Sequence, residues 1–143
     1  MLSGSVLIIE ADPDVATLVI DTLTDEGLVV SMLLDKRCAA IQEAVTRLAP
    51  NVVLLDGASP TEYGQSWDTA AWLSERDRPI PVVMFTGHAE DVAEAQLGKS
   101  ARSQRAAFAG IVAKPFDLQV LIDVVAGVVQ QPTGMDHSAR YLN

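Results

Sequence analysis

Cysteine is nearly absent from this chain, in which Cys38 is the only one among 143 residues. No disulfide can form within the chain, which favours a reduced, cytoplasmic setting, and we interpret Cys38 as a buried apolar residue of a helix. Long apolar runs are also missing, and none has the length and hydrophobicity needed to cross a membrane. Because no basic segment precedes an apolar one at the N-terminus, we expect no signal peptide.

Basic residues are scarce as well. Ten lysines and arginines stand against nineteen acidic residues, so the formal net charge is −9, which argues against DNA, RNA or an anionic membrane as a direct partner. The sequence has no glycine-rich phosphate loop, no nucleophile-elbow serine and no histidine–aspartate partner set. A small hydrolase or nucleotide-binding enzyme is therefore disfavoured. About half of the residues (49%) are apolar, which is enough for one globular core.

Strand and helix patterns alternate along the chain, which predicts an α/β fold with a parallel sheet and helices on both faces. The expected strands are residues 6–9, 28–32, 52–56, 82–86 and 111–113. The expected helices are residues 13–26, 38–48, 65–74 and 117–130, with a further helical stretch after residue 86. We expect one domain over residues 1–130 and a short flexible tail over residues 131–143.

Local signals locate the ends of the first helix. Asp12 is suited to the N-cap, Pro13 to the first helical position and Gly27 to the left-handed position after the last turn. The periodicity assigns the buried stripe of this helix to Val15, Leu18, Val19 and Leu23.

Polar side chains end three of the predicted strands. Asp56 closes an apolar run and is followed by turn residues, Thr86 ends the next run, and Lys114 ends the last. The carboxyl ends of parallel strands meet at the edge where open α/β sheets bind ligands. We therefore expect a carboxylate, a hydroxyl and an ammonium group to lie together at that edge.

These motifs, in this order and at this spacing, resemble the receiver domain of two-component response regulators. The resemblance covers about residues 5–130. The matching elements are Glu10 after the first strand, Asp56, Pro60, Gly64, Thr86, and the run Ala113-Lys114-Pro115-Phe116-Asp117.

The resemblance implies a flavodoxin-like, doubly wound sheet of order 2-1-3-4-5. It implies that Asp56 accepts a phosphoryl group from a histidine kinase or phosphotransfer protein, with Lys114 and Thr86 contacting that group and a cis peptide before Pro115. It also implies Mg²⁺ held by Glu10, Asp56 and the backbone carbonyl of Ala58. Such a domain is a signalling module rather than an enzyme, with at most self-phosphorylation from small phosphodonors and self-dephosphorylation.

The metal site departs from the family pattern. Two adjacent acids usually follow the first strand, whereas Ala11 stands at the second position here. Alanine cannot ligate a metal, and Asp12 is the alternative ligand, although it also suits the helix cap. Because metal affinity follows the number and charge of the ligands, we expect weak Mg²⁺ binding.

Two further departures affect how such a domain would signal. Ile111 stands where the family often has an aromatic ring that moves on activation, and isoleucine is stiff. The segment between Thr86 and Lys114 is longer than usual, and Gly98 divides it. Its basic end is interpreted as a solvated helix end or as a docking surface for an acidic partner; the basic residues are Lys99, Arg102 and Arg105.

The last helix is apolar over an unusually wide arc. We assign its core stripe to Leu118, Leu121, Ile122, Val125 and Val129. A second stripe consists of Val120, Val124 and Val128. So wide an arc predicts a partner surface, and a second copy of the chain, in a homodimer, is the candidate partner.

Two functional interpretations remain open. In the first, Asp56 is a phosphoacceptor, and the domain signals by changing its binding to a downstream protein. In the second, the chain is a phosphate-independent pseudo-receiver that acts as an interaction module. Ala11 and Ile111 favour the second interpretation, whereas Asp56, Thr86 and Lys114 favour the first.

Overall fold

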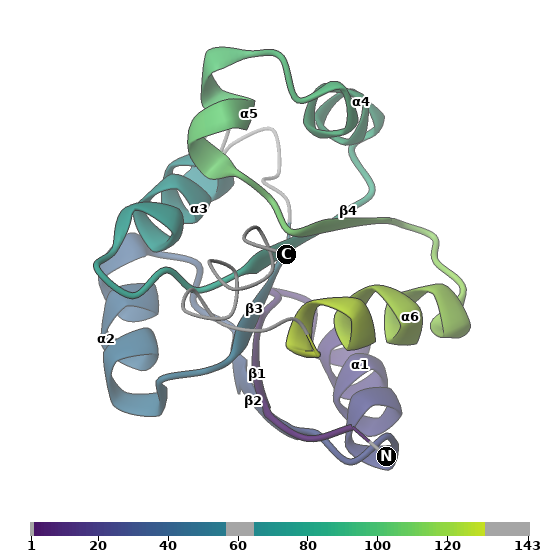
Figure 1. Ribbon diagram of the computed structural model, residues 1–143. Coiled ribbons are helices and arrows are strands. Elements are labelled where there is room, and N and C mark those ends of the chain that lie inside the picture. The colour runs from purple at the N-terminus through teal and green to yellow at the C-terminus, as the bar shows by residue number, and fades with distance from the viewer. Residues whose placement is uncertain (1, 57–64, 131–143) are drawn as a thin grey trace, which may run out of the picture.

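Five parallel strands form one sheet in the computed structural model, which describes residues 2–56 and 65–130. The strand order is β2-β1-β3-β4-β5 (Figure 1), which confirms the predicted flavodoxin-like topology. The strands are β1 (Ser5–Ile9), β2 (Val29–Leu33), β3 (Val52–Asp56), β4 (Val82–Thr86) and β5 (Gly110–Ala113).

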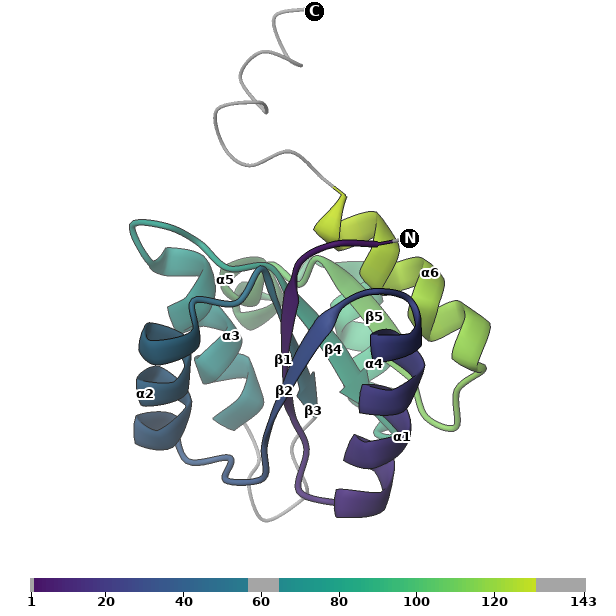
Figure 2. The same cartoon turned by 90° about the horizontal axis from the view of Figure 1, so that it is seen from below.

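Helices cover both faces of this sheet (Figures 1 and 2). One face carries α1 (Pro13–Asp25) and α6 (Leu118–Val129), and the other carries α2 (Cys38–Leu48), α3 (Gln65–Glu75) and α5 (Ala101–Ala106). The helix α4 (Ala89–Leu97) lies against β4 and β5. Successive residues of β1 alternate between the two cores: Val6 and Ile8 pack on the α1 and α6 side, and Leu7 and Ile9 on the other. The inner strands are therefore buried on both faces, as their unbroken apolar runs predict.

The local helix signals are confirmed. Asp12 caps α1, because its Oδ1 accepts hydrogen bonds from the backbone N–H groups of Asp14 (2.9 Å) and Val15 (3.5 Å). Gly27 has a positive φ of 100° after α1, and Gly98 has a φ of 65° as the left-handed cap of α4. Gly98 thus divides the long segment between β4 and β5, so the described residues form six helices, one more than strict alternation predicts.

Three predicted burial assignments are wrong. Leu18 is 47% exposed, because the inward stripe of α1 runs through Ala16, Val19 and Leu23, and adjacent residues of a helix point about 100° apart. Cys38 is exposed rather than buried, since it opens α2 before the inward stripe begins at Ile41.

The third wrong assignment concerns the last helix. The core stripe of α6 is Leu121, Val125 and Val128, so Val128 belongs to the core and not to a partner surface. Val124 also packs against that core, whereas Leu118 and Val120 are 40% and 49% exposed. The free apolar surface of α6 is therefore narrower than its sequence suggests.

Two of the three bases at the end of the long β4–β5 segment, Arg102 and Arg105, are paired with acids of the same chain. Arg102 donates to Glu94 at 2.6 Å and 2.7 Å, and its guanidinium group stacks over the Trp67 ring at 4.2 Å. Arg105 donates to Glu75 of α3 at 3.0 Å. These contacts tie α5 to α4 and α3, so two of the three bases act within the fold.

In the described part of the chain, no helix is long and apolar enough to span a bilayer.

The Glu94 contacts predict an acid-sensitive contribution to stability. Hydrogen bonds from Arg102 and Ser100 hold the pKa of Glu94 at about 2, below its ordinary 4.5. A lowered folded-state pKa stabilises the fold above pH 4.5, and this stabilisation is lost as the pH falls from 4.5 towards 2. We expect the difference in unfolding free energy between the wild type and Glu94→Gln to shrink over that range in urea titrations. Glu43→Gln, at an exposed position of α2, is the control and should show no such trend.

Two leucines of α6 test the revised core. Leu121 is fully buried and Leu118 is 40% exposed. Leu121→Ala should lower the free energy of unfolding by roughly 2–5 kcal/mol through lost burial and a residual cavity, and Leu118→Ala by about 0.5 kcal/mol. Equal losses for the two variants in urea denaturation would contradict the assigned orientation of the helix.

Candidate functional site

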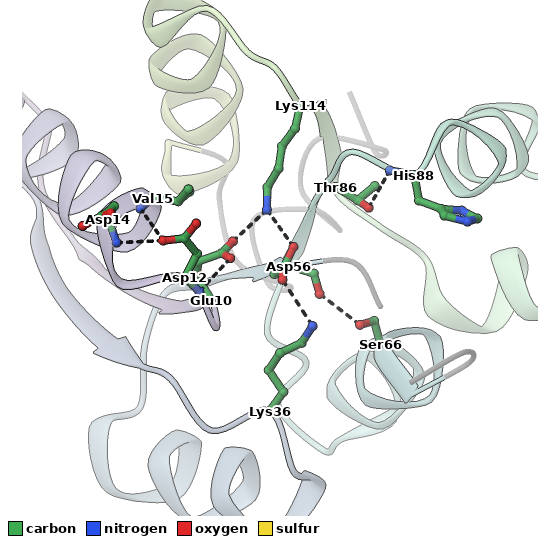
Figure 3. Close-up of polar contacts among 10 residues, drawn as sticks. All are labelled: Glu10, Asp12, Asp14, Val15, Lys36, Asp56, Ser66, Thr86, His88 and Lys114. Atoms are coloured by element: carbon green, nitrogen blue, oxygen red, sulfur yellow. Dashed lines mark hydrogen bonds and ion pairs between the residues drawn. The ribbon is translucent and has the colours of Figure 1, made fainter. Parts of the chain in front are cut away.

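Three charged side chains meet at the carboxyl ends of β1, β3 and β5 (Figure 3). The Lys114 Nζ lies 2.8 Å from Asp56 Oδ1 and 2.9 Å from Glu10 Oε2. Glu10 follows β1 directly, Asp56 ends β3, and Lys114 follows β5, so the parallel register brings together residues far apart in the sequence. The predicted meeting of Asp56 and Lys114 at one sheet edge is present in the structure. Lys114–Pro115 is a cis peptide, as the resemblance implies.

A fourth charged residue, Lys36, joins the cluster, and the sequence patterns did not predict it. It lies between β2 and α2, and its Nζ approaches Asp56 Oδ2 at 3.2 Å. Its side chain is only 9% exposed. The signal that could have found it is topological: β2 is parallel to the other strands, so the residues following Leu33 open onto the same edge.

Burial and pairing shift the protonation of this cluster. Burial raises the pKa of the Glu10 carboxyl, and the hydrogen bond from Lys114 offsets this only in part. For Lys114, burial lowers the pKa of the ammonium, but hydrogen bonds to Asp56 and Glu10 outweigh it, and the net shift is upward. Lys114 therefore stays charged at neutral pH, and its partners are held by charge-assisted hydrogen bonds.

Thr86 lies on β4, beside β3, with its side chain buried. Its Oγ1 accepts a hydrogen bond from the backbone N–H of His88 at 3.0 Å, and its carbonyl accepts one from the N–H of Lys114 at 2.7 Å. The N-cap of α4 is His88, so Thr86 is not the cap. Ser66 donates from Oγ to the Asp56 carbonyl at 3.0 Å and links the start of α3 to the site.

An open pocket of about 200 Å³ adjoins this cluster. Its walls come from the strand ends, at Thr86, Gly87 and Lys114, and from α4, at Val92 and Gln96. Thr86 and Lys114 thus belong both to the strand ends and to the wall of an open pocket, so a movement of either side chain would change a surface that another molecule can reach.

The described residues do not fit a divalent cation well. Both Asp56 oxygens and Glu10 Oε2 already accept hydrogen bonds from ammonium groups, and the side chain of Asp12 caps α1. Ala58, whose carbonyl was a predicted ligand, lies outside the described residues, as do Pro60 and Gly64. Within residues 2–56 and 65–130, no group of three or more histidine, cysteine, aspartate or glutamate side chains is placed to hold a metal ion.

Comparison with known families gives the context for this geometry. The family described as response regulator receiver domain matches residues 6–126. This chain belongs to that family. It is thus a signalling domain of the two-component type. No curated protein matches the chain.

Solved structures of receiver domains show the same fold. The BeF3-activated N-terminal receiver domain of RstA from Klebsiella pneumoniae is 21% identical, with a TM-score of 0.69 over 89% of this chain and 99% of that one. A response regulator receiver protein from Burkholderia phymatum is 18% identical, with a TM-score of 0.68 over 91% of this chain and 98% of that one.

A longer protein also contains this fold. NtrX from Brucella abortus, solved in complex with ADP, is 20% identical, with a TM-score of 0.74. The match covers 99% of this chain but only 29% of the NtrX chain. At these identities the likeness establishes the fold alone.

The contacts of Asp56 with the ammonium groups of Lys36 and Lys114 predict that Asp56 stabilises the fold. Removing one partner of a buried ion pair costs roughly 3–5 kcal/mol. Because the side chain of Lys114 is 24% exposed, we expect Asp56→Asn to lower the free energy of unfolding by less, about 2 kcal/mol. Asp77→Asn, which removes an exposed acid elsewhere, should leave stability unchanged. A gain in stability for Asp56→Asn would mean that repulsion among acids dominates the site.

Proposed function

We propose that this receiver domain accepts a phosphoryl group on Asp56 from a histidine kinase or phosphotransfer protein and signals by altered protein–protein binding. The observation that carries the proposal is the 2.8 Å contact between Asp56 Oδ1 and Lys114 Nζ at the carboxyl edge of the sheet, in a chain of the receiver family. Phosphoryl transfer needs a positioned nucleophile and positive charge against the phosphoryl oxygens, and this pair provides both.

The transfer uses the carboxylate as nucleophile. An Asp56 oxygen forms a bond to phosphorus while the bond from phosphorus to the donor histidine nitrogen breaks, and the imidazole keeps that electron pair. The Lys114 ammonium neutralises charge on the phosphoryl oxygens. The hydroxyl of Thr86 now accepts from His88 N–H, and it can rotate to donate to a phosphoryl oxygen instead. That rotation would alter the start of α4 beside the pocket, where a downstream protein can bind.

We propose that this site binds Mg²⁺ only weakly. Ala11 offers no ligand, and the oxygens of Asp56 are engaged by lysines. Glu10, Asp56 and the Ala58 carbonyl are the ligands that the family pattern would supply. Charged oxygen ligands set the affinity for this ion, so the remaining set is too small for tight binding.

The proposal also covers the extent and assembly of the domain. The receiver unit is residues 1–130, followed by a tail. A second copy of the chain can contact α6 through Leu118 and Val120, which are exposed. If so, Val120→Glu should shift a dimer towards monomer in sedimentation velocity measurements, whereas Asp123→Glu, on the same helix, should not. An unchanged distribution with Val120→Glu would remove α6 from the interface.

A phosphate-independent interaction module is the second candidate. The specific observation in its favour is that ammonium groups already neutralise Asp56, so the carboxylate is paired without any phosphoryl group. In that case partner binding would be the same for the wild type and Asp56→Asn.

The deciding experiment is the intact mass of the protein after incubation with acetyl phosphate, with and without Mg²⁺. One added phosphoryl group is expected on the wild type and none on Asp56→Asn. Lys114→Ala should slow formation of the adduct by roughly 100-fold, which is typical of removing one preorganised charge-stabilising group. Absence of an adduct under all conditions, with a cognate kinase as well as with the small donor, would favour the interaction module.

A further inference from the structure

We propose that Lys36 is a second phosphoryl-binding residue, whose ammonium group takes the place of a divalent cation at Asp56. The inference rests on the proposed phosphorylation of Asp56. It adds Lys36 to the residues that bind the phosphoryl group, and it implies that the transfer does not need Mg²⁺. Three features of the described residues support it: the geometry at Asp56, the way in which Lys36 is held, and the charge of the site.

Lys36 and Lys114 contact different oxygens of Asp56. Lys36 Nζ is 3.2 Å from Oδ2, and Lys114 Nζ is 2.8 Å from Oδ1. Figure 3 shows the two side chains approaching the carboxylate from opposite sides. A phosphoryl group formed on either oxygen therefore starts beside an ammonium group. The chain has only three lysines, Lys99 being the third, so this convergence of two on one carboxylate is not a consequence of abundance.

The segment around Lys36 holds its side chain towards the site. The Asp35 carboxylate accepts hydrogen bonds from the backbone N–H of Arg37 at 2.9 Å and from its guanidinium Nε at 2.9 Å and 3.0 Å. The two neighbours of Lys36 in the chain, Asp35 and Arg37, are therefore hydrogen-bonded to each other. Lys36 itself is 9% exposed, whereas an ordinary surface lysine keeps its ammonium in water. A buried ammonium group needs a charged partner, and Asp56 is one.

The charge of the cluster favours an added anion over an added cation. Among residues 2–56 and 65–130, the carboxylates of Glu10 and Asp56 are paired with the ammonium groups of Lys36 and Lys114. A divalent cation beside Asp56 would face the Lys36 ammonium at short range, and Ala11, next to Glu10, supplies no carboxylate to offset that repulsion. Conversion of the Asp56 carboxylate to an acyl phosphate adds negative charge, which the two ammonium groups can neutralise.

The step itself is balanced without a metal. With acetyl phosphate as donor, an Asp56 oxygen forms the new bond to phosphorus, the bond from phosphorus to the acetyl oxygen breaks, and acetate leaves with that electron pair. No proton, oxidant or reductant is required. Lys36 and Lys114 neutralise the phosphoryl oxygens during the transfer.

The first test follows adduct formation from acetyl phosphate by intact mass in EDTA and in Mg²⁺. The wild type should form the Asp56 adduct in EDTA at about the rate seen with Mg²⁺. Lys36→Met keeps the stem of the side chain without its charge and should slow the reaction in EDTA by roughly 100-fold, while Lys36→Arg should retain much of it. Lys99→Met, at an exposed lysine, is the matched control and should behave as the wild type. Circular dichroism checks that each variant is folded.

The second test measures metal binding directly on the unphosphorylated protein by isothermal titration with Mg²⁺. The double variant Ala11→Asp/Lys36→Met should bind Mg²⁺ at least tenfold more tightly than the wild type, because a carboxylate replaces the methyl group and the competing ammonium is gone. Equal affinity for the two proteins would overturn the proposal whether or not phosphorylation occurs.

The outcomes separate this inference from the proposed function. A wild-type adduct that forms only with Mg²⁺, or a Lys36→Met variant that reacts as fast as wild type in EDTA, would overturn the role of Lys36 and leave Asp56 as phosphoacceptor. Absence of an adduct on any folded variant, with or without metal, would overturn both.

Discussion

The contact between Lys114 and Asp56 is the interaction on which the site depends. These residues are separated by 58 positions in the chain, and they meet because β3 pairs with β4 and β4 pairs with β5 in parallel register. Asp56 lies opposite Phe85, and Thr86 lies opposite Ala113. Through its second contact with Glu10, the same ammonium group also reaches the end of β1. Charges with so little exposure are tolerated only when they are paired, so the polar cluster depends on the strand order that brings its members together.

The fold and the main pair of site residues could be predicted because their signals are local. Asp12 and Pro13 start a helix, Gly98 ends one, and each apolar run with a polar residue behind it marks a strand end. Parallel topology then places those ends together without further information. The same topology places the segment after β2 at this edge, but Lys36 follows its strand by three residues in an irregular segment, so topology alone does not predict the direction of its side chain. Whether such a side chain turns inward depends on the Asp35–Arg37 turn and on an acceptor from another strand.

Helix orientation is the second thing that the sequence leaves open. In α1 and α6 the apolar residues cover more than one face, so several stripes satisfy a helical period. The sheet selects one of them: Ala16, a small residue, faces inward in α1, while the larger Leu18 faces water. In α6 the same selection buries Val128 and exposes Leu118. Hydrophobicity alone would bury Leu18 before Ala16 and does not separate Val128 from Leu118, because it ignores the packing space between a helix and the strands beneath it.

The arrangement around Thr86 indicates how the site can affect the surface. At rest the Thr86 hydroxyl accepts from the backbone N–H of His88, the residue that caps α4. A hydroxyl can donate one hydrogen bond while accepting others. Negative charge added at Asp56 would therefore favour the orientation in which the Thr86 hydroxyl donates towards that charge. The carbonyl of Thr86 accepts a hydrogen bond from the N–H of Lys114, so the movement that we propose for Thr86 is rotation of its side chain. In the proposed function, a signal from Asp56 through this residue would therefore reach the beginning of α4 and the adjoining pocket.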